Sequence, residues 1–145
     1  MSNRPEGPTA IPGSASRRGH ALLVEDDELS AVYATAALQH FGWEVSLARD
    51  GEEAVNATVD RRFDVIFMDY HLPLRNGLEA TKMIRLAEAH AGGPGMPIVG
   101  LTASASSEER QRCLNAGMDD VLCKPFLLAE MLQMLDRWVP ARAAG

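Results

Sequence analysis

A short apolar run that ends in an aspartate, FDVIFMDYHLPLRNG at residues 63–77, constrains the fold of this chain more than any other stretch. Residues 65–68 are continuously apolar, as a strand covered on both faces of a parallel sheet requires. Pro73 opposes continuation as a strand or an early helix, and the Asn-Gly pair at 76–77 is typical of a turn. We therefore expect Asp69 to end a central strand, at the edge where open parallel sheets bind ligands.

Strand and helix patterns alternate along the rest of the chain. Besides the central strand, apolar segments predict strands at 21–24, 43–48, 98–101 and 121–123, each followed by a helical pattern. Short parallel strands joined by right-handed helical crossovers form a doubly wound, three-layer α/β sandwich. For a five-stranded (βα)5 chain we predict the flavodoxin-like order 2-1-3-4-5, which places the first and third strands side by side.

Helix faces and helix starts are also predicted by spacing. Two helices have apolar residues at helical intervals: Leu29, Val32, Tyr33, Ala36 and Ala37 in the first, and Leu128, Met131, Leu132, Leu135 and Trp138 in the last. Asp50 with Glu53, and Ser106 with Glu109, have the spacing of capping boxes. In a capping box the glutamate side chain returns to the backbone at the start of its own helix.

Length and composition predict one domain with two tails. A chain of 145 residues that is 46% apolar is long enough for one hydrophobic core. Residues 1–19 are rich in Pro, Gly and Ser and carry almost no large apolar side chains, so we predict a flexible tail or linker there. The domain is expected over 20–140, with a C-terminal tail at 141–145. Because few residues follow Trp138, no output domain is expected after it.

Charge and cysteine usage exclude several classes of function. A net charge of −6 without a basic stripe argues against a nucleic-acid partner. The apolar run at 21–24 is too short for a signal peptide or a membrane span, so no membrane association is expected. Cys113 and Cys123 lack CxxC spacing and are interpreted as buried or half-buried thiols. We therefore predict a cytoplasmic protein.

Ionisable and hydroxyl side chains follow the other strands and would meet Asp69 at one edge of the sheet. Glu25 and Asp26 follow the first strand, Thr102 ends the fourth and Lys124 follows the fifth. Neighbouring carboxylates repel one another unless a lysine or a hard divalent cation compensates them, and Mg²⁺ takes oxygen ligands of this kind. Mg²⁺, a nucleophilic carboxylate, a hydroxyl and an ammonium together suit phosphoryl transfer.

The segments around these residues resemble the receiver domain of two-component response regulators, and in particular receivers attached to hybrid histidine kinases. The matching segments are LLVEDDE at 22–28, VIFMDYHLPLRNG at 65–77, PIVGLTA at 97–103 and DDVLCKPF at 119–126. Each segment alone is a weak signal. Four of them in the correct order, each at the end of a predicted strand, are highly specific.

The resemblance implies a role for each residue of the site. Asp69 would accept a phosphoryl group from the phosphohistidine of a histidine kinase or histidine phosphotransfer protein, and would catalyse its own transfer and slow dephosphorylation. The Mg²⁺ ligands implied are Glu25, Asp26, Asp69 and the backbone carbonyl of His71. Thr102 and Lys124 would bind phosphoryl oxygens.

The same resemblance implies features around the site. Ala103 would leave room for the phosphoryl group, and the Lys124–Pro125 bond is expected to be cis. The output surface would be the fourth helix, fifth strand and fifth helix, contacted by a downstream protein. Val121 departs from the family, because many receivers carry an aromatic switch residue at this position and a β-branched side chain cannot swing a ring. It is therefore a candidate modulating position.

Other interpretations stay open from the sequence. Val121 suggests a receiver-like interaction module that signals without phosphorylation. A haloacid-dehalogenase-like phosphatase also uses a strand-end aspartate and Mg²⁺, but His71 stands where such enzymes usually carry a second aspartate. A flavin-binding role is weaker, because the loop after the first strand is acidic. The chain is either a stand-alone regulator or a segment of a hybrid histidine kinase.

Overall fold

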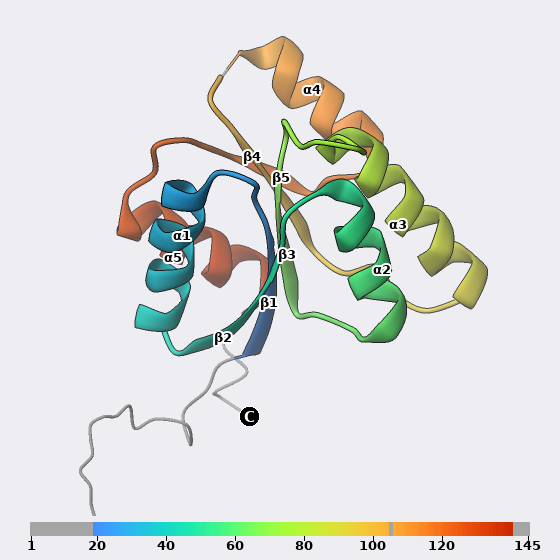
Figure 1. Ribbon diagram of the computed structural model, residues 1–145, viewed down its shortest axis with the longest axis horizontal. Helices are drawn as coiled ribbons and strands as arrows, with labels where there is room; N and C mark the ends of the chain where they lie inside the picture. Colours follow the sequence, from blue (N-terminus) through green and yellow to red (C-terminus); the bar gives the residue numbers. More distant parts are fainter. Residues whose placement is uncertain (1–18, 105, 141–145) are drawn as a thin grey trace, which may run out of the picture.

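Five parallel strands form the central sheet in the computed structural model, which describes residues 19–104 and 106–140 (Figure 1). They are β1 Gly19–Val24, β2 Trp43–Ala48, β3 Val65–Asp69, β4 Ile98–Thr102 and β5 Asp120–Cys123. Their order is β2-β1-β3-β4-β5, and every neighbouring pair is parallel. The predicted flavodoxin-like order is therefore confirmed.

Five helices complete three layers around this sheet. They are α1 Glu28–His40, α2 Gly51–Asp60, α3 Gly77–Ala91, α4 Ser107–Ala116 and α5 Leu128–Trp138. Figure 1 shows α1 and α5 on one face of the sheet and α2, α3 and α4 on the other. No helix within the described ranges is long and apolar enough to cross a membrane.

The central strand β3 supplies both halves of the core. Val65 and Phe67 lie in the cluster beneath α1 and α5, whereas Ile66 and Met68 lie in the cluster beneath α2, α3 and α4. All four side chains are fully buried. The unbroken apolar run in the sequence is explained, because alternate residues of a strand point to opposite faces and both faces are covered here.

Strand β1 begins two residues before its predicted start at 21. Gly19 pairs with Trp43 of β2, and the backbone amide of His20 donates to Asp64 Oδ2 at 2.9 Å. A Cβ atom on Gly19 would lie 2.8 Å from Asp64 Oδ2 and 2.9 Å from the Trp43 ring, so any other residue here would force these side chains to shift. The remaining residues of the predicted tails, 1–18 and 141–145, lie outside the described residues.

The predicted apolar face of the first helix is wrong. Leu29, Val32 and Tyr33 are 81%, 61% and 44% exposed, and Ala36 is exposed as well. The buried residues of α1 are Ala31, Ala34, Ala37 and Leu38. Three of these four are alanines, whose small side chains let α1 pack close to the sheet, and Leu29, Val32 and Tyr33 lie on the outer side. Of the predicted face, only Ala37 is buried.

Two smaller sequence interpretations also need correction. Cys113 is buried as expected, but Cys123 is exposed; both thiols are free. Asp50 caps α2 by accepting from the Glu53 amide at 2.8 Å, while the Glu53 carboxylate accepts from the amide of Arg49, one residue before the cap. The predicted capping box of α2 is therefore only half formed, because the Glu53 carboxylate binds the amide of Arg49 and not that of Asp50.

A buried carboxylate joins α4, β5 and α5 at the amino end of β5. Asp120 is 2% exposed, and its oxygens accept bonds from Arg137 at 2.8 Å, Trp138 at 3.0 Å and the Val121 amide at 2.8 Å. Arg110 of α4 lies 3.3 Å from the same carboxylate. Burial on its own would raise the pKa of Asp120, but the bonds from Trp138, Val121 and Arg137 outweigh it and hold this pKa below its usual value.

Replacing this carboxylate with an amide is expected to destabilise the protein. At about pH 7, Asp120→Asn should lower the free energy of unfolding by roughly 1–3 kcal/mol, because charged donors lose an ionised partner. Since the folded-state pKa is depressed, the stabilisation is present above the unfolded value of 3.8 and is lost as the pH falls through the folded-state pKa. The difference between variant and wild type should therefore shrink on acidification in urea denaturation experiments.

A matched control is Asp136→Asn, which removes a carboxylate from an exposed position of α5. This variant should have the same free energy of unfolding as the wild type, both at about pH 7 and after acidification. A destabilisation of Asp120→Asn that does not change with pH would contradict the role of its charge.

Candidate functional site

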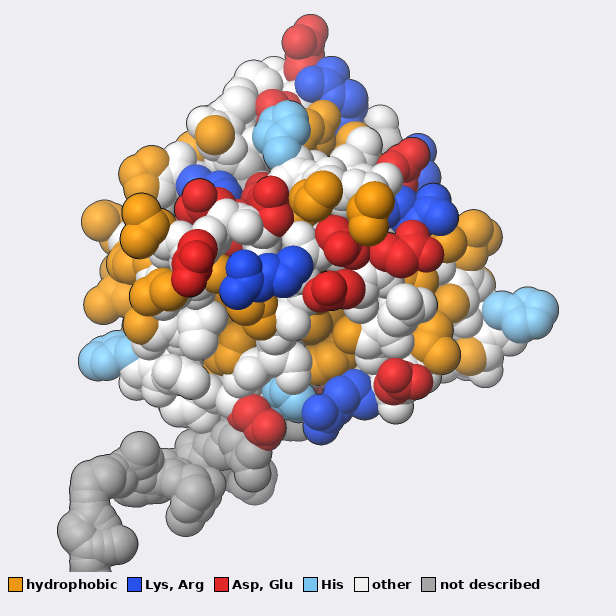
Figure 2. Space-filling view, viewed as in Figure 1, with side chains coloured by type: hydrophobic (Ala, Val, Ile, Leu, Met, Phe, Trp, Pro, Cys, Tyr) orange, Lys and Arg blue, Asp and Glu red, His pale blue; other side chains and the backbone are white. Residues whose placement is uncertain are grey.

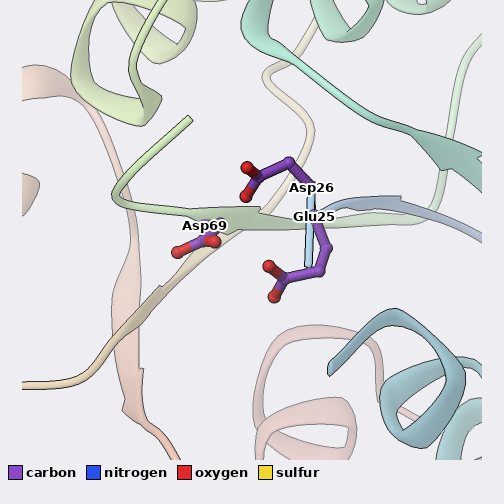
Figure 3. Close-up of side chains that lie close together, drawn as sticks. All are labelled: Glu25, Asp26 and Asp69. Atoms are coloured by element: carbon purple, nitrogen blue, oxygen red, sulfur yellow. The ribbon is translucent and has the colours of Figure 1, made fainter. Parts of the chain in front are cut away.

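Three carboxylates meet where β1 and β3 end. Glu25, Asp26 and Asp69 each place an oxygen within 4.8 Å of the others, and Figure 3 shows them around the ends of these two neighbouring strands. Glu25 is 1% exposed and Asp69 is 5% exposed, whereas Asp26 faces solvent. The predicted acidic cluster is therefore brought together by the sheet.

The next acidic residue, Asp27, caps the start of α1 and is not part of the cluster. The Asp27 side chain accepts from the Ser30 amide at 2.8 Å and so caps the helix. The backbone amide of Glu25 donates to Ala48 O of β2 at 3.0 Å, and Glu25 Oε2 accepts from the Asp27 amide at 3.2 Å. Glu25 and Asp26 are thereby held between the strand end and the helix cap.

Lys124, at the end of β5, bridges the two buried carboxylates. Its Nζ donates to Glu25 Oε1 at 2.9 Å and lies 3.5 Å from Asp69 Oδ2. Burial alone would lower the pKa of Lys124, but its bonds to Glu25 and Asp69 raise this pKa above its usual value. The ammonium therefore stays charged and offsets part of the negative charge at the edge of the sheet.

The surroundings of Asp69 disfavour its ionised form even though Lys124 is nearby. Burial, followed by the hydrogen bond and charge of Glu25, raises the pKa of Asp69 to about 7. Lys124 and the His71 amide, 3.4 Å from Asp69 Oδ1, act in the opposite direction but do not restore the usual value. An all-oxygen cluster with one lysine for three carboxylates fits a hard divalent cation such as Mg²⁺, which would favour the ionised form of Asp69.

Thr102 lies at the same edge, at the end of β4. It pairs with Cys123 in the sheet, its side chain is 1% exposed, and its Oγ1 accepts from the Ser104 amide at 3.1 Å. The hydroxyl itself donates to a carboxylate oxygen of Glu109 in α4. Sequence reasoning missed this role of Glu109, because its spacing from Ser106 pointed to a bond within its own helix.

A hollow adjoins the acidic cluster between α1 and the loop that follows β5. Its apolar lining includes Leu29, Tyr33 and Phe126, and it is bordered by Lys124 and by the exposed Ala103. The Tyr33 hydroxyl donates to Phe126 O at 2.8 Å and joins the two sides. The Lys124–Pro125 bond is cis, as predicted.

Two further predicted positions lie near the site without a direct test of their roles. His71 is exposed, and its ring packs edge-on against Tyr70 with centroids 4.7 Å apart. The role of its backbone carbonyl as a metal ligand stays a prediction. Val121 is half-buried and packs against the core cluster beneath α3 and α4. The loop after Asp69 also needs a glycine at position 77. A Cβ atom on Gly77 would lie 2.2 Å from the Asp69 carbonyl oxygen, which is too close for any other residue.

The doubly wound sheet, with an acidic cluster, a hydroxyl and a lysine at its carboxyl edge, defines a receiver domain of two-component signalling. The family model of the response regulator receiver domain matches residues 21–136. The chain belongs to this family.

Known relatives agree with this membership. The chain is 38% identical over 122 residues to hybrid signal transduction histidine kinase A of Dictyostelium discoideum. The matched region covers 83% of this chain but only 6% of that kinase. The receiver domain of the sensor histidine kinase PA1611 of Pseudomonas aeruginosa, solved with magnesium in its active site cleft, is 40% identical with a TM-score of 0.76, covering 85% of this chain and 98% of that one. A co-crystal structure of the Saccharomyces cerevisiae phosphotransfer protein Ypd1 with the Ssk1 receiver domain matches with a TM-score of 0.79 and 32% identity, covering 84% of this chain and 89% of the matched chain.

The raised pKa of Asp69 predicts a stability that falls with pH. Ionised Asp69 is disfavoured in the folded protein, so stability should decrease as the pH rises from the unfolded value of 3.8 through about 7. Asp69→Asn, which does not titrate, should therefore be more stable than the metal-free wild type by roughly 1–3 kcal/mol at about pH 8, and by less at about pH 5. Urea denaturation in the presence of a chelator measures both differences.

Asp60→Asn serves as the control, since Asp60 is exposed at the end of α2. Its stability should track the wild type at both pH values. An Asp69→Asn variant that is less stable than the wild type at about pH 8 would show that Asp69 is not electrostatically strained.

Proposed function

We propose that this domain is the phosphoacceptor of a two-component phosphorelay. In a Mg²⁺-dependent reaction, Asp69 takes a phosphoryl group from the phosphohistidine of a histidine kinase or histidine phosphotransfer protein. The observation that carries the proposal is the convergence of Glu25, Asp26 and Asp69 with Lys124 at one edge of the sheet. The related receiver of PA1611, solved with magnesium in its active site cleft, supports the choice of ion. A cytoplasmic location is part of the same proposal.

The proposed chemistry begins with an ionised Asp69. One of its carboxylate oxygens attacks the phosphorus atom, a P–O bond forms, and the P–N bond to the donor histidine breaks with its electron pair returning to the imidazole ring. The residues placed to hold Mg²⁺ are Glu25, Asp26, Asp69 and, as the resemblance implies, the carbonyl of His71. When bound there, the ion supplies positive charge that offsets the carboxylates and the phosphoryl oxygens.

Lys124 and Thr102 bind the transferred group in this proposal. Lys124 Nζ already lies 3.5 Å from Asp69 Oδ2 and donates to a phosphoryl oxygen once it is present. Thr102 donates its hydroxyl to another phosphoryl oxygen, and Ala103 leaves space for the group. Attack of water on the acyl phosphate then returns Asp69 and inorganic phosphate slowly, which ends the signal.

Labelling with a small phosphodonor tests this function. Acetyl phosphate with Mg²⁺ is expected to add the mass of one phosphoryl group to the wild type, as measured by intact-protein mass spectrometry. Asp69→Asn should abolish the label, and Lys124→Ala should reduce the rate at least about tenfold, because the transition state loses a positive charge. The exposed-site control Asp60→Asn should be labelled like the wild type. Label retained in Asp69→Asn would place the acceptor elsewhere.

The protein donor is proposed to dock over α1 beside the acidic cluster. The exposed Leu29, Val32 and Tyr33 form an apolar surface that adjoins the hollow next to Lys124. Figure 2 shows hydrophobic side chains gathered on the side of the molecule formed by α1 and α5. A donor histidine must come within bonding distance of Asp69, so the donor has to cover surfaces next to the cluster, and an exposed apolar patch there favours contact. The Ypd1 complex with a related receiver supports a phosphotransfer protein as this donor.

Substitution in this surface should separate the two kinds of donor. Leu29→Asp is expected to slow phosphotransfer at least about tenfold from a phosphorylated histidine phosphotransfer protein that labels the wild type. Labelling by acetyl phosphate should not change, because that donor needs no docking surface. Leu86→Asp, at a 72% exposed position of α3, is the control and should leave both rates unaltered. Equal slowing of Leu29→Asp with both donors would indicate damage to the site instead.

Output to a downstream protein is proposed to run through α4, β5 and α5. The alternative is a receiver-like module that signals without phosphorylation, favoured by the aliphatic Val121 at the usual aromatic switch position. The labelling experiment distinguishes the two, since the alternative predicts that the wild type takes no phosphoryl group at any Mg²⁺ concentration.

A further inference from the structure

Glu109 of α4 does not make the bond that its position in the helix predicts. The Ser106 side chain accepts from the Glu109 amide at 3.2 Å, which is one half of a capping box. The other half is missing: the Ser106 amide donates to Ser104 Oγ at 3.2 Å, and the Glu109 carboxylate accepts from the Thr102 hydroxyl.

Helix α3 shows that such a box can close fully in this fold. The Asn76 side chain accepts from the Glu79 amide at 2.9 Å, and the Glu79 carboxylate accepts from the Asn76 amide at 3.3 Å. The residue spacing is the same in both helices. Glu109 is therefore diverted from a local bond by Thr102, a residue at the edge of the site.

We propose that Glu109 is a positioning residue that withholds the Thr102 hydroxyl from the site and couples phosphorylation of Asp69 to the first turn of α4. This inference rests on the proposed function. A hydroxyl has one proton and donates one strong hydrogen bond at a time. Thr102 is 1% exposed and its proton is committed to Glu109, so a bond to a phosphoryl oxygen requires that the bond to α4 is broken.

A partner for the released carboxylate is available one turn further along α4. Arg112 lies three residues after Glu109, a spacing at which side chains on a helix meet. Arg112 Nε already donates to the Tyr70 hydroxyl at 3.3 Å, and Tyr70 directly follows Asp69. That hydrogen bond and the charge of Tyr70 raise the pKa of Arg112, with smaller contributions from the charges of Glu108 and then Glu109. Exchange of Glu109 from Thr102 to the exposed Arg112 thus leaves the half-buried Glu109 carboxylate paired.

This exchange gives the site a route to α4 that does not need an aromatic side chain on β5. Val121 is half-buried and β-branched, so it cannot move a ring between inside and outside. The Thr102–Glu109 bond joins the end of β4 directly to the first turn of α4. Phosphorylation would break this hydrogen bond and loosen the amino end of α4.

Two variants of Glu109 test the inference. Glu109→Ala should be labelled by acetyl phosphate about 3–10-fold faster than the wild type, because the Thr102 hydroxyl is already free. Glu109→Gln keeps an oxygen that can accept from Thr102 and should show a smaller acceleration. Hydrogen exchange of the α4 first-turn amides should increase on phosphorylation in the wild type, and should be high before phosphorylation in Glu109→Ala.

Glu108→Ala is the matched control, since it removes the same charge from an exposed position in the same turn. It should behave like the wild type in both measurements. Wild-type labelling rate and a wild-type α4 response in Glu109→Ala would overturn the inference, and so would slower labelling. Absence of label in every variant and in the wild type would overturn the proposed function instead, which distinguishes the two failures.

Discussion

The repulsion between two buried carboxylates is the interaction on which the site depends. Glu25 and Asp69 are nearly inaccessible to water at the ends of adjacent strands, and Lys124 from the edge strand is the cation that bridges them. Burying charges costs free energy unless opposite charges compensate them. The parallel order of the sheet makes this compensation possible, because it directs β1, β3 and β5 to the same edge although their residues are far apart in the chain.

Partial compensation is also what makes the site useful. One lysine does not neutralise three carboxylates, and the pKa of Asp69 stays raised at about 7, because burial, followed by the hydrogen bond and charge of Glu25, outweighs Lys124. A site with unsatisfied negative charge gains free energy when it binds a hard cation, and a carboxylate held next to that cation is suited to accept a phosphoryl group. The same alanine packing that draws α1 close to the sheet leaves Leu29, Val32 and Tyr33 outside, beside this edge.

Two of the polar contacts between helix α4 and the rest of the domain differ in kind. Arg110 lies 3.3 Å from the buried Asp120, which also binds Arg137 and Trp138 of α5 and is not part of the acidic cluster. Glu109 binds Thr102, whose hydroxyl is needed at the site in the proposed reaction. The first contact can persist through phosphorylation, whereas the second competes with it. Such an arrangement lets one turn of a helix respond while the helix stays anchored.

The sequence by itself determined the alternation of strands and helices, the buried central strand and the ionisable residues at the strand ends, because hydrophobic period and strand-end position are local properties of the chain. The sheet order was predicted from the order preferred by five-stranded doubly wound sheets, and the tertiary structure confirmed it. Only the tertiary structure decided which face of α1 is buried, since apolar residues recur at helical intervals both on the exposed face with Leu29, Val32 and Tyr33 and on the buried face. It also decided where Glu109 binds. Spacing shows which backbone groups a side chain can reach, but the competing Thr102 hydroxyl arrives from another strand, and only the folded chain brings the two together.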